Sequence, residues 1–141
     1  MCNTVTSEHS AISTSGIHHL GLTVPDIKKT AKFFIEQLNF NKVGEKPDYP
    51  AIFVSDGSVM LTLWQVNDDQ KMHTFDRKNN IGLHHFALKL DSHEQLNTLH
   101  QKFLLQDNID IEFAPEALGD LPFKHMMCII PGGIRLELIS G

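Results

Sequence analysis

The stretch GIHHLGLTV at residues 16–24 returns as GLHHFALKL at residues 82–90, 66 positions further along the chain. In both copies a double histidine stands before or within an alternation of apolar and smaller residues, which is typical of a half-buried β-strand. A helix signal follows each copy, at Asp26 and at Ser92, and these two positions are also 66 apart. The chain therefore repeats a strand–helix unit in register.

Each expected helix is followed by signals for a β-hairpin. Asp56-Gly57 lies between apolar runs and predicts a two-residue turn, and Pro-Gly-Gly at residues 131–133 occupies the equivalent place in the second copy. Short strands at residues 41–45 and 109–113 would complete each unit as β-α-β-β-β. The hairpins are 75 rather than 66 positions apart, which predicts an insertion of about nine residues around residues 114–123. Such a repeat indicates two equivalent units that share one core.

Composition limits the partners of the chain. A net charge of -5 over 141 residues disfavours nucleic acid, and no apolar run approaches the roughly 20 residues that span a bilayer. The two cysteines do not make a disulfide framework, so we expect a cytoplasmic protein. The small, polar residues 1–15 predict a disordered arm. Residues 16–141 then form a single domain, with modules at about 16–66 and 82–141.

Strand alternation places three potential metal ligands on one face. His19 and His85 point away from the helix layer, and Glu137 on the last strand points the same way. Such a set of two histidines and one carboxylate suits a divalent ion of iron, manganese, nickel, cobalt or zinc. It also leaves coordination positions for a small substrate that holds the ion through adjacent oxygens. The alternative for each single histidine is a hydrogen-bonded structural role.

Further side chains are expected around this set. Those that should form an apolar wall of the substrate pocket are Phe53, Met60, Trp64 and Cys128. Arg135 is a candidate to bind an anionic group of the substrate. His18 and His84 should turn toward the helix layer, in packing or supporting roles. Met60 and Trp64 have a second interpretation as the core of a subunit interface. Cys128 lies in an apolar run and has a second interpretation as a small buried residue.

The motifs HHLGLTVPD, LHHFALKLD and PGGIRLELI, at residues 18–26, 83–91 and 131–139, resemble those of the vicinal oxygen chelate superfamily. This group includes glyoxalase I, extradiol dioxygenases, fosfomycin-resistance proteins, methylmalonyl-CoA epimerase and bleomycin-binding proteins. The resemblance implies an α+β fold, in which two paired β-α-β-β-β modules form a cupped eight-stranded mixed sheet with helices on the outer face. It also implies a homodimer. The metal positions of the family correspond to His19, Thr62, His85 and Glu137.

Thr62 departs from the family pattern. Glyoxalase I and the epimerase have Glu or Gln at this fourth-ligand position, whereas a threonine hydroxyl is too short and too weakly basic to reach the ion. Glu137 is then the one remaining catalytic carboxylate. A second departure is Met127, which stands where the dioxygenases have a tyrosine. We expect a metal-dependent lyase, isomerase or dioxygenase that acts on a small chelating substrate. The alternative is a metal-free protein that sequesters a ligand, as the bleomycin-resistance proteins do.

Overall fold

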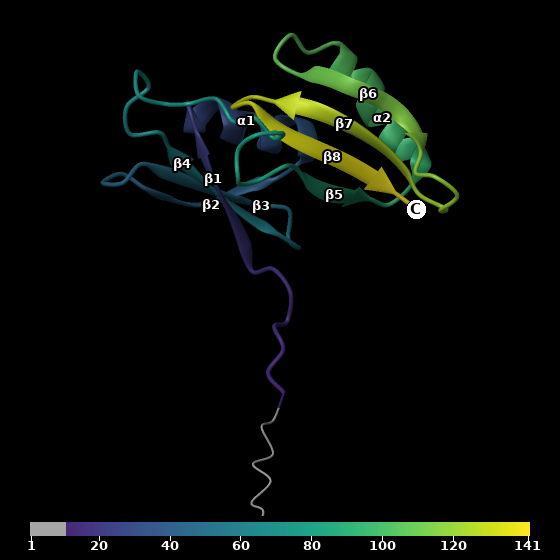
Figure 1. The fold of residues 1–141 in the computed structure, drawn as a ribbon, viewed down its shortest axis with the longest axis horizontal. Helices are drawn as coiled ribbons and strands as arrows, with labels where there is room; N and C mark the ends of the chain where they lie inside the picture. Colours follow the sequence, from purple (N-terminus) through teal and green to yellow (C-terminus); the bar gives the residue numbers. More distant parts are fainter. Residues whose placement is uncertain (1–10) are drawn as a thin grey trace, which may run out of the picture.

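The computed structural model describes residues 11–141, and its elements follow the two predicted repeats (Figure 1). The first module contains β1 (His19–Val24), α1 (Ile27–Leu38), β2 (Asn41–Lys46), β3 (Ala51–Ser55) and β4 (Met60–Gln65). The second contains β5 (Phe86–Leu90), α2 (His93–Leu104), β6 (Asp110–Ala117), β7 (Lys124–Ile130) and β8 (Ile134–Ser140). Most of the predicted arm, residues 1–10, lies outside the described residues. Neither α1 nor α2, the helices of residues 11–141, is long and apolar enough to cross a membrane.

The strands of the described chain form two four-stranded mixed sheets, ordered β1-β4-β3-β2 and β5-β8-β7-β6. In each sheet the first and last strands of the module pair in parallel, and the other neighbours are antiparallel. Gly21 is the partner of Thr62, and Ala87 is the partner of Glu137. The registers therefore make Thr62 and Glu137 equivalent positions, and the predicted α+β fold of paired β-α-β-β-β modules is confirmed.

Both helices begin at the residues that the sequence indicated. The Asp26 carboxylate accepts hydrogen bonds from the amides of Lys28 and Lys29, and the Ser92 hydroxyl accepts one from the amide of Gln95. These caps satisfy amides that have no partner inside the helix. The amide of Asp91 in turn donates a hydrogen bond to the side-chain oxygen of Gln95. In a standard capping box the donor would be the amide of Ser92, one residue later.

The two hairpin turns differ in length. Residues 56–59 join β3 to β4, so the loop has four residues instead of the predicted two, and the Asp56 carboxylate accepts bonds from the amides of Ser58 and Val59. Residues 131–133 join β7 to β8, and Gly132 and Gly133 have φ angles of 102° and 76°. The expected insertion lengthens β6 and β7 and their connection.

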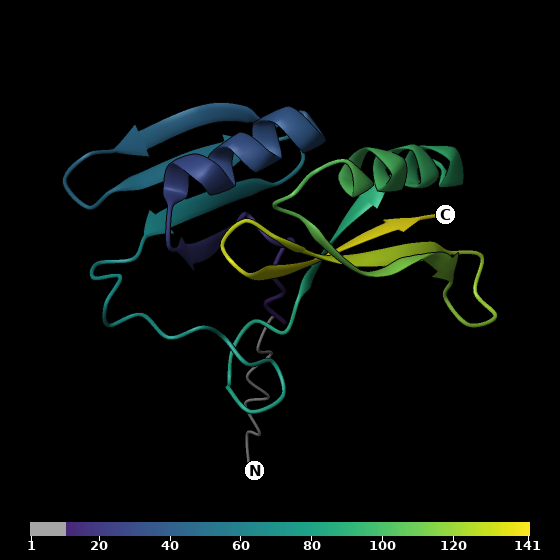
Figure 2. The same cartoon turned by 90° about the horizontal axis from the view of Figure 1, so that it is seen from above.

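The helices lie on one face of each sheet, and the linker between the modules lies on the other side (Figure 2). The helix-facing leucines of β4 and β8 are buried in one core with α1 and α2. Phe33 and Phe103 join the modules, with ring centroids 5.8 Å apart. The Thr30 hydroxyl of α1 donates a hydrogen bond of 3.1 Å to the carbonyl oxygen of Pro131 in the β7–β8 turn. Side-chain packing and a main-chain contact therefore hold the modules together.

We expect Phe103→Ala to lower the free energy of unfolding by about 3–5 kcal/mol, because Phe103 is fully buried between the modules. Urea denaturation followed by circular dichroism would measure the change. Leu105→Ala is the matched control, since Leu105 is 83% exposed and its truncation should change stability by less than about 0.5 kcal/mol. Equal effects of the two variants would contradict a core shared by the modules.

Candidate functional site

The open face of each sheet, defined as the face opposite its helix, carries the candidate residues. On the first sheet the Trp64 indole donates a hydrogen bond of 2.9 Å to the Thr62 hydroxyl, which shows that both side chains lie on this face. The Trp64 ring also packs against Tyr49 and Phe53, with centroids 5.0 and 5.9 Å away. Thr62 is only 4% exposed. Its oxygen is therefore both buried and engaged by the indole.

The open face of the second sheet brings His85 and Glu137 together. His85 Nε2 lies 3.3 Å from Glu137 Oε2. The other carboxylate oxygen, Oε1, lies 3.6 Å from Nδ1 of His125, a buried nitrogen with no hydrogen-bond partner. Two imidazoles thus flank one carboxylate whose side chain is 13% exposed.

His125 was not among the site residues predicted from the sequence. On β7 it stands two positions before Met127, the residue that pairs with Glu137, so alternation places it on the same face. Its Nδ1 faces the carboxylate, and its ring lies tilted at 59° against that of Phe113, with centroids 4.9 Å apart. Strand alternation applied to β7 would have found it.

His19 does not join His85 and Glu137 within one chain. Its hydrogen bond is with His18, at 2.8 Å between the two Nδ1 atoms. Within residues 11–141, no three His, Cys, Asp or Glu side chains are arranged closely enough to hold a metal ion. One chain therefore brings together two of the three predicted ligands.

The paired histidines interact through their rings. Nδ1 of His84 lies 2.6 Å from Nδ1 of His85 and 3.2 Å from Nη1 of Arg135. A guanidinium can only donate, so His84 Nδ1 is the acceptor of that bond. Desolvation, and then the positive charge of Arg135, lower the pKa of His84 and favour its neutral form. The hydrogen between the two Nδ1 atoms consequently lies on His85, whose Nε2 faces Glu137.

The prediction that His18 and His84 turn toward the helix layer is wrong. β1 begins at His19 and β5 at Phe86, so His18 and His84 lie outside the region where strand alternation applies. Each contacts the ring of the next histidine instead, in an edge-on arrangement.

Cys128 lies in the core instead of the predicted apolar wall of the substrate pocket. It pairs with Leu136 and is fully buried on the helix side of β7, where its thiol contacts the Leu136 carbonyl oxygen at 3.5 Å. Burial raises the pKa of the Cys128 thiol to about 12. Cys128 is therefore an inert core residue, whereas Met60, Phe53 and Trp64 lie on strands of the first sheet at half-buried positions.

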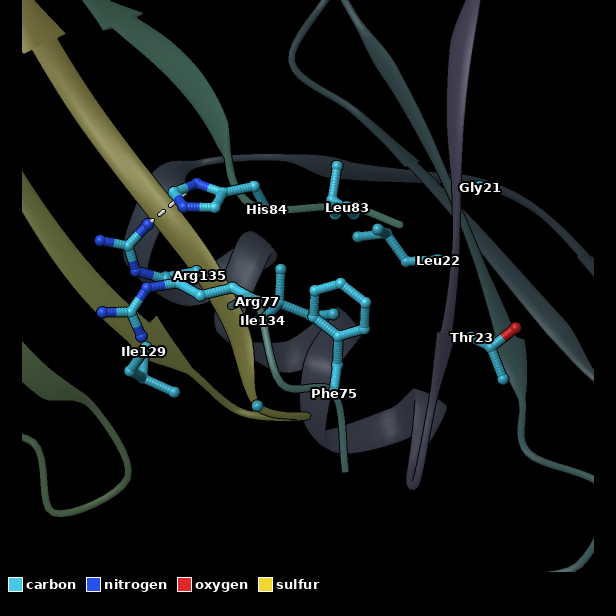
Figure 3. Close-up of a pocket in the computed structure, with 11 residues that line it drawn as sticks. Gly21, Leu22, Thr23, Phe75, Arg77, Leu83, His84, Ile129, Ile134 and Arg135 are labelled. Carbon is cyan, nitrogen blue, oxygen red and sulfur yellow. Dashed lines mark hydrogen bonds between the residues drawn. The ribbon is translucent and has the colours of Figure 1, made fainter. Parts of the chain in front are cut away.

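Arg135 lines a cavity at the junction of the modules, which we call the junction cavity (Figure 3). Its volume is about 260 Å³. Residues 21–23 of β1 form one wall, the β7–β8 hairpin forms another, and the linker contributes Phe75 and Arg77. His85, Glu137 and His19 are not among its lining residues. The anion-binding candidate Arg135 thus stands in a cavity separate from the His85–Glu137 pair.

A family model described as the Glyoxalase/Bleomycin resistance protein/Dioxygenase superfamily matches residues 16–138. Among solved structures, a glyoxylase/bleomycin resistance protein/dioxygenase domain from Frankia sp. EAN1pec has a TM-score of 0.76 at 22% identity, covering 92% of this chain and 99% of that one. A putative glyoxalase from Bacillus halodurans gives 0.74 at 22% identity, with 90% and 96% covered. The fosfomycin resistance protein FosX from Listeria monocytogenes gives 0.71 at 16% identity, with 92% and 95% covered. No curated protein matches the chain.

Replacing Thr62 by Val should separate a structural role from a ligand role. The variant removes the acceptor of the Trp64 indole, so we expect the free energy of unfolding to fall by about 1 kcal/mol in urea denaturation. Metal affinity, measured by competition with a fluorescent chelator, should stay unchanged, whereas Glu137→Gln should weaken it strongly. A tenfold loss of affinity in Thr62→Val would identify Thr62 as a ligand.

Proposed function

Because the chain belongs to the glyoxalase/bleomycin resistance protein/dioxygenase superfamily, we propose that it is a divalent-metal-dependent enzyme that acts on a small molecule. The observation that carries the proposal is the His85–Glu137 pair. Nε2 of the His85 imidazole and Oε2 of the Glu137 carboxylate lie 3.3 Å apart. A cation between them would stabilise both, and imidazole and carboxylate are ordinary ligands of iron, manganese, nickel, cobalt and zinc.

The second nitrogen of His85 supports this role. Metal-binding histidines usually donate their other N–H to an acceptor, which sets the tautomer and orients the ring. His84 Nδ1 provides that acceptor for His85. We propose His18 as the equivalent partner of His19, since the two Nδ1 atoms are 2.8 Å apart.

We further propose that two copies of the chain complete each metal site. His85 and Glu137 would come from one copy, and His19 would come from the open face of the other. Within residues 11–141, His19 does not form a metal-binding group with His85 and Glu137. This separation supports a site to which a second copy contributes its His19. Thr62 would stand beside His19 as a position without a ligand, so that coordination positions stay available to substrate.

The bound ion would hold two adjacent oxygens of the substrate and polarise them, as a Lewis acid does. Glu137 would be the catalytic carboxylate, whether the enzyme is a lyase, an isomerase or a dioxygenase. His125 would keep that carboxylate in place, because its Nδ1 lies 3.6 Å from Oε1 and its ring packs on Phe113. The aromatic cluster of Tyr49, Phe53 and Trp64 would exclude water from the substrate.

A metal-free protein that sequesters a ligand is the second candidate function. The junction cavity favours it, since a binding space exists that includes none of the proposed metal ligands. Thermal-shift measurements with metals and ligands added separately would distinguish the two. Stabilisation by a ligand that is unchanged by a chelator would favour sequestration over catalysis.

Mixing two inactive variants tests the shared site. His19→Ala and Glu137→Ala should each lose bound metal, measured by elemental analysis of protein purified without chelator. After the two are unfolded and refolded together, half of the dimers should be mixed, and each mixed dimer has one intact site. The metal content should therefore return to about a quarter of the wild-type value.

The matched control mixes His85→Ala with Glu137→Ala, whose lost ligands belong to the same copy. No mixed dimer then has an intact site, and the metal content should stay at the level of the single variants. Failure of the first mixture to recover metal would contradict a site shared between copies. Loss of metal in His125→Ala together with full metal in His19→Ala would instead assign the site to one chain.

The supporting histidine can be tested separately from the ligands. We expect His84→Phe to weaken zinc binding by about 10–100-fold, because it keeps an aromatic ring but removes the acceptor for His85 Nδ1–H. His84→Asn, whose amide oxygen can accept, should recover part of the affinity. His73→Phe, at an exposed linker histidine, is the control and should bind zinc as the wild type does. Equal affinities in all three variants would contradict the role of His84.

A further inference from the structure

The junction cavity has a charged end and an apolar end. Figure 3 shows the guanidinium groups of Arg77 and Arg135 beside one another near His84, with Phe75, Leu22 and Leu83 across the space. These residues come from β1, from β8 and from the linker and the segment before β5. The cavity therefore depends on the complete fold and cannot form within one module.

Two contacts position the linker residues that line the cavity. The Phe75 ring rests on the backbone of Gly82, where an added Cβ atom would lie 2.8 Å from the ring. Arg77 Nη2 donates to Glu112 Oε1 at 3.0 Å, which ties the linker to β6. Arg77 and Phe75 are thus in place before any ligand arrives.

Two arginines share a single carboxylate at the charged end. Arg135 Nε donates to Glu112 Oε2 at 2.8 Å, and Arg77 uses the other oxygen. The hydrogen bond from Arg135, followed by the charges of Arg135 and Arg77, holds the pKa of Glu112 below its usual value and keeps it ionised. The three groups together carry one net positive charge.

Most donors of these arginines have no hydrogen-bond partner among residues 11–141. A guanidinium has five N–H groups, and each arginine gives one of them to Glu112. Arg135 gives one more to His84 Nδ1, and the His84 ring also lines the cavity. Donors without matching acceptors, at a site with one net positive charge, fit an anion.

We propose that the junction cavity binds a small monocarboxylate with a branched or aromatic apolar body. A single negative charge matches the net charge of Arg77, Arg135 and Glu112, whereas a phosphate dianion would exceed it. The apolar body would lie against Phe75, Leu22 and Leu83. A volume of about 260 Å³ is just below the range of about 300–1,000 Å³ for drug-sized ligands, so the ligand is small. The site involves no proposed metal ligand and goes beyond the proposed metal chemistry.

Calorimetric titration of metal-stripped protein in chelator-free buffer would test the site. 4-Methylpentanoate should bind, and its amide, 4-methylpentanamide, should bind at least about tenfold more weakly because it lacks the charge. Acetate, with the charge but little apolar body, and inorganic phosphate should also bind more weakly. Equal binding of the acid and the amide, or tighter binding of phosphate, would overturn the proposal.

Variants assign the binding to the cavity. Arg77→Gln should weaken 4-methylpentanoate binding by about tenfold, whereas Lys71→Gln, the same charge change at an exposed linker residue, should leave it unchanged. Glu112→Gln should raise the affinity for inorganic phosphate, because the site then carries two net positive charges. Equal effects of Arg77→Gln and Lys71→Gln would show general charge attraction and reject the cavity. Zinc binding should persist in Arg77→Gln, so failure here is distinguishable from failure of the proposed metal site.

Discussion

Parallel pairing between the first and last strands of each module determines where the side chains of the candidate site lie. β5 and β8 are separated along the chain by α2 and a long hairpin, yet they are hydrogen-bonded neighbours. The helix must cover one face of that sheet, because Leu136 and Leu138 are buried against it. The other face is therefore the place where His85 can meet Glu137. The same pairing in the first module places Thr62 and Trp64 on its open face.

The two modules use this common geometry for different purposes. In the second module the last strand presents a carboxylate between two imidazoles. In the first module the equivalent position is a threonine buried beneath an indole. Gly21 leaves room for that contact, since an added Cβ atom would lie 3.2 Å from the Thr62 hydroxyl and 3.6 Å from the Trp64 nitrogen. Ala87 stands at the matching place in the second module, where the neighbour is Glu137.

The strand alternation and the 66-residue repeat were sufficient to predict the two β-α-β-β-β units and the faces of Thr62 and Glu137, whereas their pairing into one fold was implied by the family resemblance. Alternation failed for His18 and His84, because they precede the regular strands and their rings follow local hydrogen bonds. Cys128 lies in the core, as the apolar run around it indicated, and not in the pocket wall, since pairing of Met127 with Glu137 requires its neighbour to face the helix. The junction cavity could not be predicted, because the period of a strand contains no information on how two modules and their linker meet.

The contact between Thr30 and Pro131 affects how well the fold tolerates changes in its amino-acid sequence. The acceptor is a main-chain carbonyl, and Gly132 beside it allows a close approach, since an added Cβ atom would lie 3.2 Å from Val24 and 3.3 Å from the Thr30 hydroxyl. A docking point made of backbone survives most substitutions in the hairpin, provided that the glycine remains. Mutations can then accumulate on both open faces while the modules keep their mutual orientation. Selection for new substrates would act on those faces without first having to rebuild the scaffold.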